Sequence, residues 1–381
     1  MTRRLLHLVN AHSTNIGNGA LIEGVERVLA EDSIKPIDWR REPWDDYTFE
    51  FKRFDREFVS LVNQHDALIV NGAVAINGRS YLRNAGMRFD LPEDLWGEIK
   101  RPVIFYGLSY RHWAGQPFHH LDKFKAAVAR IQSNAAMLLG VRNDGTKAWL
   151  RDTMGIDVAR VVEVPDTAVF VPYDDGAPVP EFESKRLNVI VALNDEDTTQ
   201  RYAEAGSRER MLRCLSGAVT GMLSHWDMNI ILAPHYFDDH RMIADFIDMC
   251  PPRLAHQRMI SSGLARVGNT RQFFGRYARA DLVIAMRVHS MSPSIGLGVP
   301  MIPLVTQDRM VDFLADVGLA DLAVDALAPD LETRLFTAVE RVLADPDATR
   351  ARFATAKAGM RQRLSAFNDR VIALLDGSVP V

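Results

Sequence analysis

The sequence predicts a two-domain α/β protein whose domains are both doubly wound, Rossmann-like parallel sheets. The chain has 381 residues, more than one ordinary core needs, because domains usually contain about 100–200 residues. Short apolar runs bounded by turn residues alternate with helical patterns, and this alternation is typical of repeated β-α units. It occurs twice, before and after a segment at 172–185 that is rich in proline and acidic residues.

The composition indicates a globular protein without an overall basic field. Hydrophobic residues make up 47% and charged residues 25%, and the net charge is −4, so we expect no nucleic-acid partner. The two cysteines, Cys214 and Cys250, are too few for a disulfide framework, so we expect a reduced, cytoplasmic protein. No apolar run approaches the roughly 20 residues of a membrane span. Membrane contact would then be peripheral, at the inner face, and a homo-oligomer is left open.

The first half contains five short apolar runs that we interpret as strands. The first helix shows an apolar stripe from Leu21 to Leu29 and is expected to begin just after Gly19. A further helix at 144–154 ends at Gly155, a favourable C-terminal cap. The expected strands are 5–9, 67–71, 102–106, 136–141 and 160–164.

The second half repeats the pattern after a linker at 175–185, which separates domains at 1–174 and 186–345. The segment 346–381 alternates basic and apolar residues at helical spacing, so we expect one or two long helices there. The expected strands are 187–193, 228–233, 281–285, 300–305 and 320–324, with helices at 209–225, 239–249, 271–277, 310–317 and 331–343.

Candidate functional residues lie in the loops that follow the strands, because ligands of open α/β sheets bind at the carboxyl ends of the strands. In loop 10–19, Gly17 and Gly19 would let backbone amides approach an anion or a polar sugar group, although simple steric relief explains glycines there equally well. Arg111 follows the strand at 102–106, where a solvated side chain is the alternative to a substrate ligand. Arg142 follows the strand at 136–141, where a salt bridge is the alternative.

The loop at 285–298 (AMRVHSMSPSIGLG) concentrates the groups that anion chemistry requires. Arg287 offers a planar fork for a carboxylate or phosphate, His289 titrates near neutrality, and Ser290 adds a hydroxyl at a helix start. In an extended backbone Arg287 and His289 would point the same way. A structural histidine and a surface arginine are the alternative interpretation.

The segment 235–240 (HYFDDH) also follows a strand and contains metal-ligand residue types. A divalent cation there would use His235, Asp238, Asp239 and His240. Helix capping by Asp238 or Asp239 is the interpretation that we favour, so we expect no metal site.

With these loops in order, the chain resembles the polysaccharide pyruvyl transferase family over most of its length. The family's Asn-x-Gly-Asp loop is similar to 15–18 (NIGN), and its Arg-x-His-Ser/Ala element is similar to 287–290 (RVHS). A strand like ARADLVIAM precedes the second element, and a Gly-x-Pro-x-Ile strand like GVPMIPL follows it. The sequence departs from the family pattern at Asn18, where Asp is usual, and at Asn194, where many members carry Arg.

The resemblance implies a fold similar to the GT-B glycosyltransferases, with two domains facing across a cleft. It implies transfer of the enolpyruvyl unit of phosphoenolpyruvate, the co-substrate, to a sugar of a cell-surface glycan or exopolysaccharide precursor as a pyruvate ketal, with no other cofactor. Arg287 would bind the donor's carboxylate or phosphate, and His289 would be the general acid. The N-terminal domain would hold the acceptor and the C-terminal domain the anionic donor. Further substrate contacts would come from Asn15, Gly17, Asn18, Gly19, Arg111, Arg142 and Ser290.

Two other functions fit the same pattern. One is a glycosyltransferase of this architecture that uses a nucleotide sugar, although no clear ribose-binding carboxylate follows Ser290. The other is a non-catalytic protein that binds a saccharide or an anion, which Asn18 and Asn194 make conceivable. The retained Arg287 and His289 favour an enzyme over this alternative.

Overall fold

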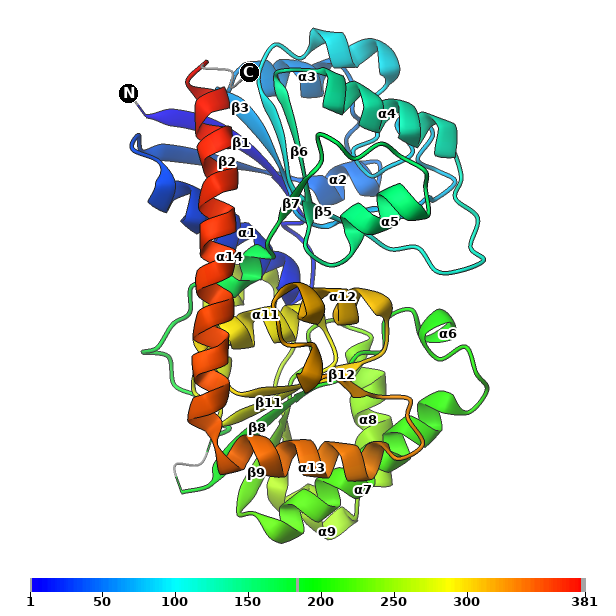
Figure 1. Ribbon diagram of the computed structural model, residues 1–381, viewed down its shortest axis with the longest axis vertical. Coiled ribbons are helices and arrows are strands. Elements are labelled where there is room, and N and C mark those ends of the chain that lie inside the picture. Colours follow the sequence, from blue (N-terminus) through cyan, green and yellow to red (C-terminus); the bar gives the residue numbers. More distant parts are fainter. Residues whose placement is uncertain (1, 183–184, 378–381) are drawn as a thin grey trace. The chain divides into compact units, whose positions relative to one another are not determined.

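The computed structural model describes residues 2–182 and 185–377 (Figure 1). The chain divides into two compact units. The first consists of the described residues of Met1–Ser13, Leu21–Thr167 and Met360–Val381, and the second of those of Thr14–Ala20 and Ala168–Gly359. The expected linker, 175–185, therefore falls within the second unit, and its residues 183 and 184 lie outside the described part, as do residues 378–381 of the expected C-terminal helices.

The first unit is built on a parallel sheet with the order β2-β1-β3-β5-β6-β7, in which β4 pairs with β5. The first strand, β1, lies between β2 and β3, so the sheet is doubly wound as expected. The strands are β1 (Arg3–Val9), β2 (Ile37–Pro43), β3 (Ala67–Asn71), β4 (Val74–Ile76), β5 (Val103–Tyr110), β6 (Met137–Arg142) and β7 (Val162–Val164).

Helices on this unit pack on an apolar sheet whose central strands are buried throughout. The face that carries Leu6, Leu8 and Val70 joins one core with Phe58, Phe89 and Phe124. The helices are α1 (Ile16–Asp32), α2 (Trp44–Thr48), α3 (Arg56–Asn63), η1 (Glu93–Glu98), α4 (Leu121–Ser133) and α5 (Thr146–Asp152), together with the end of α14 (Pro346–Leu375).

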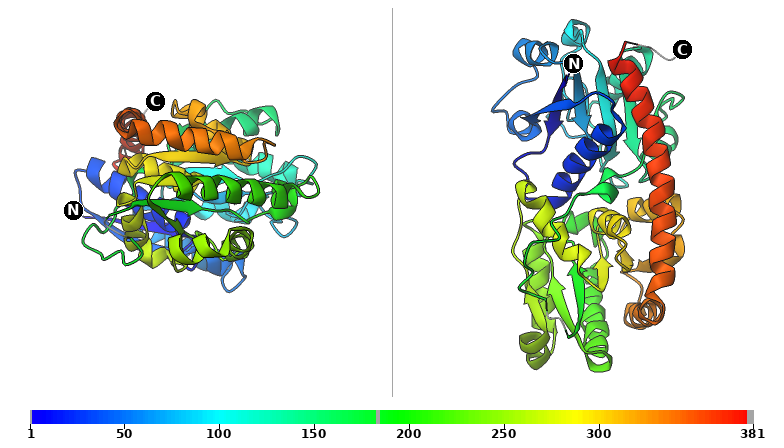
Figure 2. Two further views of the ribbon diagram at one scale, coloured as in Figure 1. Left: turned by 90° about the horizontal axis from the view of Figure 1, so that it is seen from below. Right: turned by 90° about the vertical axis from the view of Figure 1, so that its left-hand side faces the viewer.

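The second unit repeats the architecture with the strand order β10-β9-β8-β11-β12-β13, again all parallel. Alternate residues of β8 face opposite sides and all but the first are buried, so helices cover both faces of this sheet (Figure 2). The strands are β8 (Leu187–Ala192), β9 (Met228–Leu232), β10 (Met259–Ser261), β11 (Leu282–Ala285), β12 (Met301–Val305) and β13 (Val324–Asp325).

The helices of the second unit connect these strands in order, and α7 and α13 lie side by side (Figure 1). They are η2 (Thr167–Phe170), α6 (Thr198–Arg201), α7 (Ser207–His225), α8 (Asp239–Met249), α9 (Pro252–Arg258), η3 (Val267–Asn269), α10 (Thr270–Ala278), α11 (Val288–Leu297), α12 (Asp308–Asp316), η4 (Ala320–Leu322), α13 (Leu331–Ala344) and the first part of α14.

Several elements differ from the sequence-based expectation, among them the short strands β4 and β10, which were not expected. Helix α1 begins at Ile16 and not after Gly19, because Asn15 accepts a hydrogen bond from the Gly17 N–H (3.1 Å) and so caps the helix one turn earlier. The strand expected at 320–324 is instead the turn η4 followed by the two-residue β13. Strand β2 was not expected, because it is a half-exposed edge strand with no apolar run.

The long C-terminal helix is confirmed as a single element, α14. Its residues up to Gly359 belong with the second unit and those from Met360 with the first. Within residues 2–182 and 185–377, no helix is long and apolar enough to cross a membrane.

Candidate functional site

The predicted residues Arg287 and His289 lie at the point where the strand order of the second sheet reverses. Strand β8 is paired with β9 on one side and with β11 on the other, so the loops after β8 and β11 leave the sheet side by side. The first loop carries Asn194, Asp195 and Glu196, and the second carries Arg287 and His289. In doubly wound sheets this position is where ligands bind, so a ligand site at these two loops stays our prediction.

Arg287 is buried, with 6% of its surface exposed, and two acidic side chains occupy its guanidinium. One terminal nitrogen, Nη1, lies 3.0 Å from Glu196 Oε2, and the other, Nη2, donates to Asp239 Oδ1. Burial by itself would lower the pKa of Arg287, but these carboxylates outweigh it and raise the pKa. The Nε–H is buried and has no hydrogen-bond partner among the described residues. The guanidinium of Arg287, which we expected to bind a ligand, is therefore already paired with the protein's own carboxylates at both terminal nitrogens and not at Nε.

Asp239 organises the loops around Arg287. Its Oδ2 accepts hydrogen bonds from the backbone N–H groups of His235 (2.9 Å) and Tyr236 (2.9 Å), and its Oδ1 accepts one from Asp195 (3.2 Å). It is fully buried. Asp238 precedes helix α8 but makes no side-chain cap, so of the two aspartates considered from the sequence, Asp239 is the one that satisfies backbone donors.

His289 is the second residue of helix α11 and is half-buried. Because α11 begins at Val288, the backbone at His289 is helical, and the extended segment in which Arg287 and His289 would point the same way does not form. The ring of His289 packs on Gly17 in the first turn of α1. A methyl group at Gly17 would lie 2.6 Å from Cβ of His289 and closer still to the ring, so a larger residue fits only if His289 moves.

The starts of α1 and α11 thus meet at His289. A helix start carries partial positive charge and unpaired backbone N–H groups, which favour an anionic ligand. The first turn of α1 is tied to the same region, because the Ile16 N–H donates to the carbonyl oxygen of His235 (3.0 Å). This arrangement supplies positive potential that does not depend on the neutralised Arg287.

Other predicted site residues build the frame of this site. Asn15 caps α1, and its carbonyl oxygen also accepts from the Asn18 N–H (3.0 Å). A methyl group at Gly19 would lie 3.0 Å from the carbonyl oxygen of Val267. The buried Ser290 hydroxyl donates to the carbonyl oxygen of Arg287 (2.8 Å). These contacts are structural, and a direct ligand contact of Asn15, Asn18, Gly19 or Ser290 stays a prediction.

Sequence reasoning missed Arg201, which ends the short helix α6. Its Nε donates to the carbonyl oxygen of Glu196 (3.0 Å), and its Nη1 donates to the hydroxyl of Thr306. Burial lowers the pKa of Arg201 to about 10, and the charge of Arg287 acts in the same direction. The site therefore contains a second buried cation, close to Arg287. No strand-end motif marks Arg201, because a polar helical stretch surrounds it.

His235, considered from the sequence as a metal ligand, is instead a buried neutral residue. Its Nε2 lies 2.5 Å from the hydroxyl of Tyr277. Burial, followed by the charge of Arg287, lowers the pKa of His235 well below its usual value, and burial raises that of Tyr277. In the described part of the chain no three His, Cys, Asp or Glu side chains gather as a metal site would require.

In the first unit Arg142 is fully buried in an ion-pair cluster. Its Nη2 donates to the carbonyl oxygen of Gly72 (3.1 Å), and its Nε and Nη1 lie 3.5 Å from Asp166 and 3.9 Å from Asp144. Gly145 holds the N-cap position of α5, and Asp144 accepts a hydrogen bond from the hydroxyl of Ser109 (2.6 Å). The salt-bridge alternative thus describes Arg142, and a substrate contact of Arg142 stays a prediction.

Arg111 follows strand β5 and is half-buried. Its backbone N–H donates to the carbonyl oxygen of Ile76 (2.7 Å), which places it at the carboxyl edge of the first sheet. Arg111 and Arg142 therefore follow neighbouring strands, β5 and β6, but only Arg111 keeps a partly exposed side chain. Its role as a substrate ligand also stays a prediction.

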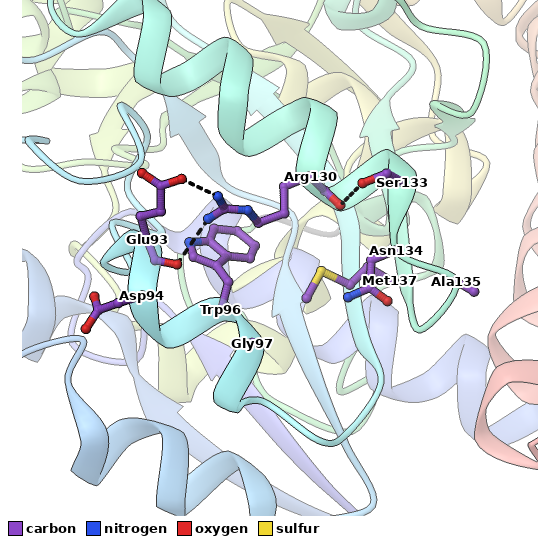
Figure 3. Close-up of a pocket in the computed structure, with 9 residues that line it drawn as sticks. All are labelled: Glu93, Asp94, Trp96, Gly97, Arg130, Ser133, Asn134, Ala135 and Met137. Atoms are coloured by element: carbon purple, nitrogen blue, oxygen red, sulfur yellow. Dashed lines mark hydrogen bonds and ion pairs between the residues drawn. The ribbon is translucent and has the colours of Figure 1, made fainter.

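A hollow of about 630 Å³ lies at the opposite edge of the first sheet (Figure 3). Its lining includes Trp96, Arg130 and Met137, and the last of these is the first residue of β6. Arg130 forms an ion pair with Glu93, in which Nη2 of Arg130 lies 2.5 Å from Oε1 of Glu93. Since the hollow is at the amino ends of the strands and contains none of the predicted residues, it is distinct from the candidate site.

Comparisons with known proteins find solved structures with a similar fold. Among solved structures, a glycosyltransferase from Rickettsia africae covers 98% of both chains with a TM-score of 0.56 and 9% identity. A UDP-forming α,α-trehalose-phosphate synthase from Burkholderia vietnamiensis gives 0.55 at 14% identity over 100% of this chain and 98% of that one. A putative UDP-N-acetylglucosamine 2-epimerase from Listeria monocytogenes gives 0.56 at 11% identity over 99% and 96%.

These similarities show the fold, which is that of GT-B glycosyltransferases and epimerases. A search of curated proteins gave no significant match. The family model described as polysaccharide pyruvyl transferase matches residues 15–308, which include both the α1 start and the Arg287–His289 loop. The chain therefore belongs to the polysaccharide pyruvyl transferase family.

Proposed function

We propose that this protein transfers the enolpyruvyl unit of phosphoenolpyruvate to a sugar of a cell-surface glycan or its precursor, forming a cyclic pyruvate ketal. The observation that carries the proposal is the position of Arg287 and His289 at the reversal of the second sheet, with the start of α1 packed on the His289 ring. Family membership supports the same reaction class.

In this proposal His289 is the general acid. It donates a proton to the methylene carbon of phosphoenolpyruvate, which becomes a methyl group, while a sugar hydroxyl bonds to the adjacent carbon and passes its proton to the phosphate group. The bond from that carbon to the phosphate oxygen then breaks, and phosphate leaves. A second hydroxyl of the sugar bonds to the same carbon, and its proton returns to the imidazole. Positioned proton transfer of this kind contributes typically about 10²- to 10⁴-fold in rate.

The second unit can attract an anionic donor even though carboxylates nearly cancel the charges of its two buried arginines. Arg287 and Arg201 are offset by Asp239 and Glu196, so the four side chains together are close to neutral. The excess positive potential comes from the starts of α1 and α11, which converge on His289. We place the donor's phosphate or carboxylate against these helix starts, where it would exchange with Glu196 at Arg287.

The test is phosphate release from phosphoenolpyruvate in the presence of nucleotide-linked and lipid-linked sugars. The native protein is compared with His289→Ala and with His256→Ala, an exposed histidine of the same unit. Acceptor-dependent release that His289→Ala abolishes and His256→Ala retains would support the proposal. Absence of release together with absence of phosphoenolpyruvate binding in calorimetry would reject it, and nucleotide-sugar donors would then be assayed. Binding without turnover for every donor would point to the non-catalytic alternative.

A further inference from the structure

Arg88, in the connection between β4 and η1, is held by neutral groups. Its backbone N–H donates to the carbonyl oxygen of Ala75 (2.8 Å), and its Nη2 donates to the hydroxyl of Thr48 (2.8 Å). The guanidinium carbon lies 5.1 Å from the ring centre of Trp44, whose indole N–H donates to the Arg88 carbonyl oxygen (3.2 Å). The side chain is therefore fixed in place without an acidic partner.

The charge of Arg88 is uncompensated. Among residues 2–182 and 185–377, no carboxylate lies within ion-pair distance of its guanidinium, and its Nε is buried without a hydrogen-bond acceptor. Burial lowers the pKa of Arg88; Tyr81 and Asp45 act in the opposite direction, and Arg111 adds to the lowering. An unpaired charge removed from water is costly, so binding of an anion at this point would stabilise the protein.

Arg111 brings a second cation to the same strand. Its N–H bonds to Ile76, the neighbour of the Ala75 carbonyl that fixes Arg88, so the two arginines flank the three-residue strand β4. Each of the two residues keeps an intermediate share of its surface exposed. The next residue, Asn77, has a buried Oδ1 that lacks a donor among the described residues, and a sugar hydroxyl could supply one.

We propose that Arg88 and Arg111 form an anion site in the first unit that binds the diphosphate carrying the acceptor sugar. Two adjacent cations match a group with at least two negative charges, and arginine forks suit phosphate oxygens. The site is separate from the Arg287 site, which belongs to the second unit. The acceptor role rests on the proposed function, whereas diphosphate binding by Arg88 does not.

Calorimetric titration of the full chain with inorganic pyrophosphate and with a nucleoside diphosphate tests the binding step. Arg88→Gln should weaken the affinity about 10- to 100-fold, as expected for loss of a charged hydrogen-bond donor. Arg83→Gln, an exposed arginine of the same connection, is the matched control and should bind like the native protein. Arg287→Gln should retain this binding event, which separates the two sites. Native affinity in Arg88→Gln would overturn the proposal.

Loss of binding counts only if the fold is intact, so thermal unfolding of each variant is measured in parallel. Arg88→Lys keeps the charge and provides a second test, because it should bind more tightly than Arg88→Gln. Equal affinities of a folded Arg88→Lys and Arg88→Gln would show that the charge does not act on the anion, and this result would also reject the site.

Kinetics test the acceptor role. In Arg88→Gln the KM for a diphosphate-linked sugar should rise about 10-fold or more while the KM for phosphoenolpyruvate stays unchanged. Comparison of a nucleoside diphosphate sugar with a polyprenyl diphosphate sugar identifies which source of diphosphate the site takes. A raised KM for phosphoenolpyruvate alone would contradict the assignment to the acceptor. Complete absence of acceptor-dependent phosphate release in the native protein would reject the proposed function and leave the calorimetric result standing.

Discussion

Replacing Gly17 with alanine should displace His289 and reduce activity with little loss of stability. The added methyl group would lie 2.6 Å from Cβ of His289, whereas ordinary contact begins at 3.4 Å. The side chain of His289 must therefore retreat by about 0.8 Å, the difference between these distances. Because the nearest atoms include Cβ, rotation of the ring alone cannot relieve the overlap.

A displacement near 1 Å at a catalytic group can cost about 10²-fold in rate, so we expect kcat/KM for phosphate release to fall by about that factor. The stability cost of such overpacking is about 1–3 kcal/mol, part of which the better helix propensity of alanine offsets. Thermal unfolding should therefore remain cooperative, with a Tm only a few degrees lower.

Two measurements test the displacement of His289. Phosphate release gives the kinetic effect, and the carbon-bound ring protons of His289, followed by NMR, report its surroundings whether or not the protein is active. Gly17→Ala should shift the His289 resonances and leave those of the exposed His256 unchanged. An unshifted His289 resonance with native kcat/KM would show that α1 does not pack on this ring.

Three further changes should have measurable effects. Gly359→Ala, in the exposed interior of α14 where a new methyl group meets no atom within 4 Å, should raise the unfolding free energy by about 0.5–1 kcal/mol. Glu196→Gln removes a negative charge 3.0 Å from Arg287, so the KM for phosphoenolpyruvate should fall about 2- to 10-fold. Burial raises the pKa of Glu26, but hydrogen bonds from Arg41 and from a histidine outweigh it and lower the pKa from 4.5 to about 2. Its ionised form therefore stabilises the fold above pH 4.5 by about 3 kcal/mol, and this stability is lost as the pH falls toward 2. Denaturant unfolding of Glu26→Gln should lack this pH dependence.

Most of the fold was predictable because parallel strands buried on both faces appear as short apolar runs. This signal located β1, β3, β5 and β6 in one sheet and β8, β9, β11 and β12 in the other. It failed for β2, an edge strand whose exposed positions are charged, and it misplaced the start of α1. The apolar stripe of α1 begins at Leu21, whereas the Asn15 cap starts the helix five residues earlier.

The sequence was enough to select the candidate residues of the site, but it did not reveal which side chains they pair with. Loop position and chemistry were enough to select Arg287 and His289, because strand-end loops are recognisable from sequence. The partners of Arg287 lie 48 and 91 residues away, at Asp239 and Glu196, and no local pattern announces such contacts. The surroundings of Arg88 could not be predicted for the same reason, because its position depends on hydrogen bonds to distant parts of the first unit.

The pairing of Arg287 also constrains how an anion could reach it. Asp239 is fully buried and fixed by backbone N–H groups, so it cannot leave Arg287 without abandoning those donors. Glu196 keeps 17% of its side chain exposed, so water can replace Arg287 as its partner. An anionic donor would therefore exchange with Glu196, and Asp239 would stay bound to Nη2 and keep the guanidinium oriented. We therefore propose that Asp239 positions the arginine and that Glu196 is the carboxylate that an anionic donor would displace.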